Sequence, residues 1–174
     1  MNKMAKNILI TYATYTGSAQ TVAEQVSINL SSKGFKTTVL PMTHVRDLDG
    51  YDAVVAGSAI HGGKWLPEAF DFLESHKEAL NSRPFAAYLV CMTMAMKNSG
   101  KYLQFVSDFM DPVRRIVNPV SEGLFAGRLE IKKVPSLSDR VKFRISVVTG
   151  LMKEGDHINK TEIIKWSDSL SHLL

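Results

Sequence analysis

Short apolar runs alternate along the chain with amphipathic stretches of helical periodicity. The runs that indicate strands cover residues 7–12, 35–41, 53–58, 85–92 and 123–131. The stretches that indicate helices cover residues 18–33, 67–80, 99–117 and 161–174. In the first helical stretch, Val22, Val26 and Leu30 share one face, and Gly34 ends the pattern. We expect Pro112 to bend the helix predicted for residues 99–117.

Two of the strand-like runs, residues 53–58 and 85–92, are apolar throughout, which is typical of strands buried on both faces. With the strand–helix alternation, this predicts an α/β fold in which helices cover both faces of a parallel sheet. We predict a doubly wound, three-layer, five-stranded sheet of order 2-1-3-4-5 in a single domain, residues 1–174. Residues 128–157 are predicted to form a basic, partly helical insertion before the last helix.

Ligands of such sheets bind outside the carboxyl ends of the strands, where the strand order reverses. In the predicted order that point lies between the first and third strands. The loops that follow the first, third and fourth strands therefore form the candidate site.

The loop after the first strand is rich in hydroxyl groups. Thr14, Thr16 and Ser18 surround Gly17 directly before a predicted helix start. Unpaired amides and the helix dipole make such a start an anion cradle. The loop has no lysine or arginine, so it is not the lysine-bearing loop of nucleoside triphosphatases, and it favours a monophosphate. The alternative is an ordinary capped turn.

The loop after the third strand, residues 58–66, combines two glycines with two rings. Gly62 and Gly63 allow the backbone to approach a flat ligand, and His61 and Trp65 offer ring faces. Alternatively, Trp65 covers the core. The loop after the fourth strand, residues 93–98, is apolar and then basic, and its methionines could pad a ring or belong to the core.

Composition narrows the class of protein. The chain has 174 residues, of which 45% are apolar, enough for a substantial core. Cys91 is the only cysteine, which excludes an intramolecular disulfide and a cysteine metal cluster and fits a reducing cytoplasm. The basic start precedes a run too short for a signal peptide, and residues 85–96 are too short to span a bilayer. We expect a cytoplasmic protein without a metal site.

The formal net charge of +4 selects no partner by itself, but the insertion is markedly basic. Its cations are Arg128, Lys132, Lys133, Arg140, Lys142, Arg144 and Lys153. Apolar residues recur there near helical spacing, at Leu137, Val141, Ile145, Val148 and Met152. Such a helix could lie on an anionic membrane or be an ordinary surface helix with a solvated face.

The first loop resembles the phosphate loop of the flavodoxin-like FMN-binding family at Thr14, Thr16, Gly17 and Ser18; Ala19 departs from it, where a hydroxyl residue is usual. His61 stands where flavodoxins often have a tryptophan over the flavin. Residues 54–64, residues 125–129 and the basic stretch after them resemble the flavodoxin-type, menaquinone-dependent protoporphyrinogen oxidases.

The resemblance implies FMN as cofactor and residues that bind it. These are Thr14, Tyr15, Thr16, Gly17, Ser18, Ala19, Ser58, Ala59, Ile60, His61, Gly62, Gly63, Trp65, Thr93, Met94 and Ala95. It also implies oxidation of protoporphyrinogen, with electrons passed to a quinone and peripheral membrane contact. The cations that we expect to meet the substrate's propionates are Lys64, Lys97, Arg128 and Lys132.

Three hypotheses about function follow. The preferred one is an FMN oxidoreductase in which His61 is the candidate catalytic residue, as a hydrogen-bond donor or proton shuttle. The second is an FMN electron carrier without its own substrate, whose basic rim meets an acidic partner. The third is a module without redox activity that binds a protein or nucleic acid through the basic stretch, although we expect no nucleic acid. Cys91 lies in an apolar strand and is expected to be inert core.

Overall fold

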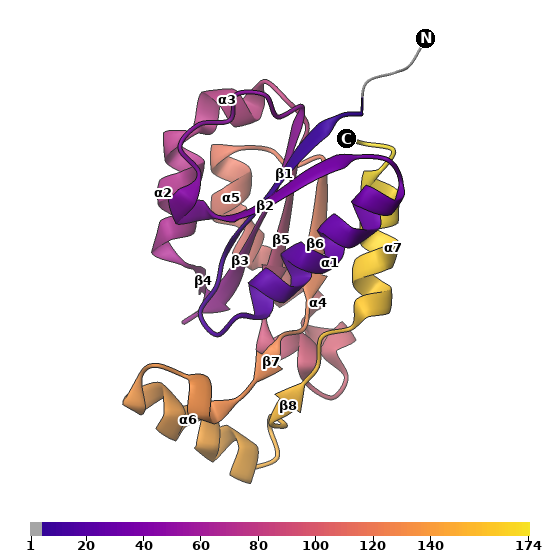
Figure 1. Ribbon diagram of the computed structural model, residues 1–174. Helices are drawn as coiled ribbons and strands as arrows, with labels where there is room; N and C mark the ends of the chain where they lie inside the picture. The colour runs from indigo at the N-terminus through magenta and orange to yellow at the C-terminus, as the bar shows by residue number, and fades with distance from the viewer. Residues whose placement is uncertain (1–4) are drawn as a thin grey trace.

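The computed structural model describes residues 5–174 and contains a central parallel sheet (Figure 1). Its strands are β1 (Asn7–Ala13), β2 (Lys36–Pro41), β3 (Ala53–His61), β5 (Phe85–Val90) and β6 (Ser121–Phe125). They lie in the order β2-β1-β3-β5-β6, and every neighbouring pair is parallel. The predicted fold class and strand order are therefore confirmed.

Helices cover both faces of the sheet. On one face lie α1 (Ser18–Ser32) and α7 (Lys160–Leu170), which pack on each other (Figure 1). The other face carries α2 (Pro67–Ser75), α3 (Lys77–Asn81), α4 (Leu103–Ser107) and α5 (Asp111–Ile116). Side chains alternate along β1. Ile8 and Ile10 therefore pack in the core under α1 and α7, and Leu9 and Ala13 pack in the core on the α2 face.

The third strand is longer than predicted. Residues 59–61, expected only as loop, continue β3, and Gly62 and Gly63 turn the chain into the short antiparallel β4 (Lys64–Trp65). Both glycines have positive φ, 58° and 74°, as a tight hairpin turn requires. The Ser58 hydroxyl accepts a hydrogen bond from the Leu66 amide at 3.0 Å and closes the hairpin.

Two predicted helices are broken. Residues 99–117 form a 3₁₀ turn, α4, another 3₁₀ turn and α5. Pro112 lies in the first turn of α5, so it starts a helix instead of bending one, because its missing amide is tolerated there. The stretch 67–80 is divided at His76 into α2 and α3. At the other boundaries, α7 ends at Leu170, and β5 ends at Val90, before a 3₁₀ turn (Met92–Ala95).

The predicted fifth strand is also divided. β6 ends at Phe125, and Arg128–Leu129 forms β7, which pairs antiparallel with β8 (Gly155–Asp156) outside the main sheet. Between β7 and β8 lies α6 (Leu137–Val148), whose start is capped by the Ser136 hydroxyl. The insertion of residues 128–157 is thus partly helical, as predicted, and lies beyond the carboxyl ends of the strands (Figure 1). Among residues 5–174, no helix is long and apolar enough to cross a bilayer.

Candidate functional site

The loop between β1 and α1 leaves a helix start open to a ligand. Gly17 adopts the left-handed conformation at φ 92°, and its amide donates to the Thr14 hydroxyl at 2.9 Å. Within the described chain, no side chain caps α1 and no acidic residue occupies its first turn. The first amides of α1 can therefore bind an anion, which the helix dipole also favours.

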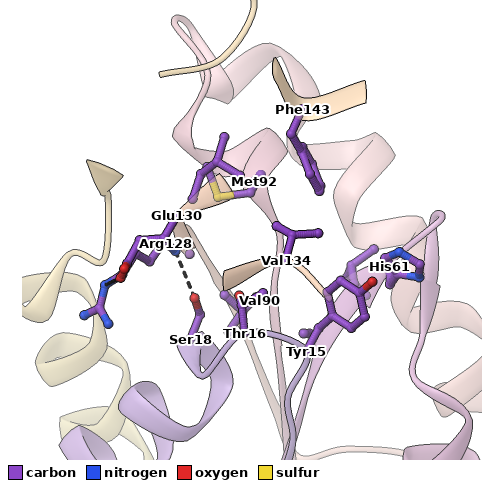
Figure 2. A pocket seen from close by; sticks show the side chains of 14 residues that line it. Tyr15, Thr16, Ser18, His61, Val90, Met92, Arg128, Glu130, Val134 and Phe143 are labelled. Atoms are coloured by element: carbon purple, nitrogen blue, oxygen red, sulfur yellow. Dashed lines mark hydrogen bonds and ion pairs between the residues drawn. The ribbon is translucent and has the colours of Figure 1, made fainter. Parts of the chain in front are cut away.

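Ser18 joins this loop to the chain that follows β6. Its side chain is almost completely buried, and its hydroxyl oxygen accepts a hydrogen bond from the Arg128 amide at 2.9 Å (Figure 2). A hydroxyl that accepts one bond still has its proton to donate. Gly127 permits this approach, since a Cβ there would lie 3.0 Å from Cγ1 of Val90 and 3.3 Å from the Ser18 hydroxyl.

Two adjoining cavities lie at the carboxyl edge of the sheet. The first, of about 60 Å³, lies beside the β1–α1 loop, and the second, of about 290 Å³, lies beside the β3–β4 hairpin and the turn after β5. Ile60, His61, Met92 and Phe143 line both. The larger one approaches the roughly 300–1,000 Å³ of typical small-molecule sites.

The structure brings many of the predicted site residues to these cavities. The predicted residues that line them are Tyr15, Thr16, Ser18, Ala59, Ile60, His61, Gly62, Gly63, Thr93 and Arg128. Thr14, Gly17 and Ala19 lie in the same β1–α1 segment and shape it. The predicted loops after β1, β3 and β5 therefore meet at one edge, as the strand order requires.

Other predicted residues lie elsewhere. Trp65 is only 2% exposed and packs in the core on the α2 face, so the expected ring face at the ligand is wrong and the core interpretation holds. Ser58 is fully buried and serves the hairpin. Met94 packs against the core, Ala95 closes the 3₁₀ turn beside it, and neither lines a cavity.

Of the four cations predicted to bind the substrate, only one lines a cavity. Lys64, Lys97 and Lys132 are exposed and line neither cavity. Arg128 lines the first cavity, but its guanidinium contacts Asp156 at 2.6 Å and Glu130 at 3.6 Å. A propionate would therefore compete with two carboxylates for Arg128.

Sequence reasoning missed the walls that come from distant segments. Val90 and Met92 line the cavities from the end of β5, and Phe105 and Phe109 line the second from the broken helix. The insertion contributes Val134, Phe143 and Met152. The apolar character of these residues was visible, but no local pattern shows which apolar residues of separate segments share a cavity.

A carboxylate of the insertion binds both principal loops. Asp139 accepts hydrogen bonds from the Tyr15 hydroxyl at 3.1 Å and from Nε2 of His61 at 3.0 Å. The rings of Tyr15 and His61 lie 4.4 Å apart at 31° (Figure 2). The His61 hydrogen bond, followed by the one from Tyr15, lowers the pKa of Asp139 despite its partial desolvation, and burial followed by the Asp139 contact raises the pKa of Tyr15.

The sheet order is that of the flavodoxin fold. An uncapped, hydroxyl-rich helix start and an apolar cavity lie at its switch point, as in proteins that bind a nucleotide cofactor. The chain belongs to the flavodoxin domain family, whose model matches residues 9–154. FMN is accordingly its cofactor. No curated protein matches the chain.

Solved structures agree on the fold. A flavodoxin from the domain Archaea matches with a TM-score of 0.52 at 18% identity, over 95% of this chain and 99% of that one. A short-chain flavodoxin associated with a non-canonical PDU bacterial microcompartment matches with a TM-score of 0.55 at 18% identity, over 84% and 99%. The flavodiiron protein of Giardia intestinalis matches with a TM-score of 0.51 at 14% identity, over 96% of this chain but 38% of that one.

The residues at the site fit FMN. The open amides of α1 and the hydroxyls of Thr16 and Ser18 suit a phosphate, and the apolar cavity between the β3–β4 hairpin and Met92 suits a flat ring. Residues 5–174 contain no group of three or more His, Cys, Asp or Glu side chains that could hold a metal ion.

Proposed function

We propose that this protein is an FMN-dependent oxidoreductase that converts protoporphyrinogen IX to protoporphyrin IX and passes the electrons to a quinone. One observation carries the proposal. The insertion lies over the cofactor loops and adds aromatic and apolar walls beside the place of the cofactor, where an apolar tetrapyrrole could contact the protein. A carrier that docks other proteins needs only an exposed cofactor edge.

The protein's own residues would bind, orient and exclude water. The α1 amides, Thr16 and Ser18 would hold the phosphate, and Ile60 to Gly63 with Met92 and Thr93 would flank the ring. FMN, when bound, would supply the redox chemistry between the substrate and the quinone. His61 lies at the wall of both cavities, where its imidazole can hold or move a proton.

The reaction balances with a quinone as oxidant. Converting the porphyrinogen to the porphyrin removes six electrons and six protons, and these reduce three quinones to three quinols. The substrate's propionates need cations at the rim of the cavity. Lys64 follows the cavity residue Gly63 on the β3–β4 hairpin, Lys97 follows the 3₁₀ turn that holds Thr93, and Lys132 belongs to the insertion; all three are exposed.

Peripheral membrane contact belongs to the same proposal, because quinones reside in the bilayer. The outer side of α6 exposes Leu137 (74%), Val141 (60%), Ile145 (58%) and Val148 (81%). Lys142 and Arg144 are exposed on the same helix. An apolar stripe with flanking cations is the pattern of a helix that lies on an anionic membrane surface.

The alternative is an FMN electron carrier without a small-molecule substrate. It is supported by the family assignment, since both full-length neighbours described above are flavodoxins. The basic residues around the cavity would then meet an acidic redox partner.

Turnover of the FMN-loaded protein separates the two. Protoporphyrinogen and a water-soluble menaquinone analogue are supplied without oxygen, and porphyrin fluorescence is followed. The oxidase proposal predicts porphyrin formation that depends on protein, FMN and quinone together. Porphyrin formation at the rate of the protein-free control, with rapid electron exchange with a reduced redox protein, would instead support the carrier.

A further inference from the structure

We propose that residues 128–157 form a cover for the FMN site and that Asp139 is the positioning residue that fastens this cover to both cofactor loops. The proposal rests on FMN as the cofactor and is independent of the porphyrinogen reaction. It assigns to this insertion a part in binding the cofactor, beyond what the β1–α1 loop, the β3–β4 hairpin and the turn after β5 provide.

The first step is the wall that the insertion supplies. Phe143 projects from α6 and lines both cavities, and Val134, which is buried, lines the first (Figure 2). Met152, after α6, lines the second. The space for the cofactor is therefore closed on one side by the insertion, and Phe143 offers an aromatic face to a ring in it.

The second step is the attachment of the insertion at its base. β7 and β8 pair at Arg128 with Asp156 and at Leu129 with Gly155, and the Arg128 guanidinium binds Asp156 at 2.6 Å. The Arg128 amide donates to Ser18, and the His157 amide donates to the Gly127 carbonyl at 3.2 Å. These contacts hold the two ends of the insertion but leave α6 to be held by other means.

The third step is the position of α6 itself. None of its twelve residues is fully buried, so packing alone holds it weakly. Asp139, in its first turn, is largely screened from solvent, with a side chain that is 14% exposed. Its carboxylate reaches Tyr15 from the phosphate loop and His61 from the hairpin at the same time. One side chain thereby ties three segments that are far apart in sequence.

The fourth step is the effect on the two rings. A carboxylate oxygen that accepts from both Tyr15 and His61 fixes the orientation of each, and the rings stack at 4.4 Å. Because Nε2 of His61 is engaged by Asp139, the imidazole is held at the cavity wall in one orientation. The second carboxylate oxygen lies 3.5 Å from Lys142, on the next turn of α6.

The charged groups around this contact favour an ionised Asp139. His61, Tyr15 and Lys142 face the carboxylate, and Lys64 lies opposite His61 in the backbone register of the β3–β4 hairpin. The hydrogen bond from His61, then that from Tyr15 and the nearby charges, hold the pKa of Asp139 below its ordinary value. Asp139 is therefore ionised at neutral pH, where FMN binding is measured, and can accept both hydrogen bonds.

The test compares Asp139→Asn with Asp139→Glu and with the control Asp71→Asn, whose carboxylate is exposed on α2 away from the cofactor cavities. FMN affinity is measured by quenching of flavin fluorescence, and hydrogen exchange of the α6 amides is followed by mass spectrometry. We expect Asp139→Asn to weaken FMN binding roughly two- to tenfold and to speed exchange in α6. Asp139→Glu should recover part of both, and Asp71→Asn should change neither.

The visible circular dichroism of bound FMN reports on positioning, because it depends on the groups that surround the ring. It should change in Asp139→Asn and return part of the way to native in Asp139→Glu, which keeps a carboxylate that can reach Tyr15 and His61. Native dichroism in Asp139→Asn would show that Asp139 does not position the groups around the ring and would overturn the proposal.

Two further results would overturn it. Native FMN affinity and native α6 exchange in Asp139→Asn would show that Asp139 does not fasten the insertion. Faster α6 exchange with unchanged FMN affinity and dichroism would show that the contact is structural and that the insertion does not cover the cofactor. If FMN itself failed to bind the native chain, the cofactor assignment would fail first, which distinguishes the two failures.

Discussion

Gly57, in the middle of β3, lies directly under the ring of Tyr88 on the neighbouring strand β5. A Cβ built on Gly57 would lie 1.9 Å from Cζ of Tyr88 and 2.1–2.2 Å from both Cε atoms. Carbon atoms normally pack at about 3.5–4.0 Å, so the ring would have to move by well over 1 Å. Tyr88 is completely buried, and the rings of Phe125 and Trp166 lie beside it. Gly57→Ala is therefore expected to be a damaging change despite its small size.

The magnitude follows from the contacts of Tyr88. Overpacking a filled core costs about 1–3 kcal/mol. The Tyr88 hydroxyl donates to the Ala19 carbonyl at 2.8 Å, and losing such a bond costs about 0.5–1.5 kcal/mol. Alanine opposes this by about 0.5–1 kcal/mol, since it restricts the unfolded chain more than glycine does. We expect Gly57→Ala to lower the free energy of unfolding by roughly 1–4 kcal/mol.

Urea unfolding followed by circular dichroism measures this loss, and an unchanged m-value shows that the same surface is exposed. Gly100→Ala is the matched control, because no atom lies within 4 Å of its Cβ position and its φ is not positive. Its effect should stay within about 0.5 kcal/mol. FMN affinity should fall in Gly57→Ala alone, because Ala19 lies in the first turn of α1 beside the phosphate loop.

The clash itself is tested in a second background. In Tyr88→Ala the ring is gone, so adding Gly57→Ala should be neutral or slightly stabilising. An equal loss in the native and Tyr88→Ala backgrounds would refute the reasoning, because the cost would then not come from the ring. A native-like Gly57→Ala protein would refute it as well.

Three further predictions concern the site, the surface and pH. Ser18→Ala should weaken FMN binding by about 1 kcal/mol or more in a fluorescence titration, since it removes a hydroxyl from the phosphate loop; Ser82→Ala, on an exposed turn after α3, should leave it unchanged. Val141→Ser with Val148→Ser should reduce co-sedimentation with anionic liposomes while leaving unfolding within about 0.5 kcal/mol of native, because both side chains are exposed; native-like co-sedimentation would count against membrane contact. Hydrogen bonds from Asn29 and then Lys33 hold the pKa of Asp168 below its ordinary 3.8, so this contact stabilises the fold above that pH and is lost as the pH falls through the lowered pKa. Between about pH 5 and pH 3 the urea midpoint of the native chain should therefore fall more than that of Asp168→Asn, and parallel declines would contradict this assignment.

The strand order could be predicted because it depends on patterns that are local. Apolar runs such as residues 53–58 fix which segments are buried strands, and the strand–helix alternation then permits few topologies. The carboxyl edge of the sheet follows from that order, and with it the meeting of Thr16, Ile60 and Thr93 around one pair of cavities.

The parts that could not be predicted depend on contacts between distant residues. The apolar pattern predicts that the third strand ends at Ser58. In the structure the Ser58 hydroxyl accepts from the Leu66 amide and closes a hairpin, and β3 continues for three more residues. Asp139 lies 124 residues from Tyr15 and 78 from His61, and nothing near it in sequence shows that it binds them. Trp65 looked like a ring face for the ligand because its burial depends on the same hairpin.

The orientation of α6 reverses what its pattern indicates. The apolar residues at helical spacing, Leu137, Val141, Ile145 and Val148, would ordinarily face the protein, yet all four are exposed. The opposite side carries Asp139 and Phe143, which contact the cofactor loops and cavities. A polar contact thus fixes the helix over the site and leaves its apolar side unpaired among the described residues. Because an exposed apolar stripe is costly in water, we infer that this side is retained for a partner, and the adjacent cations make an anionic membrane the partner to test first.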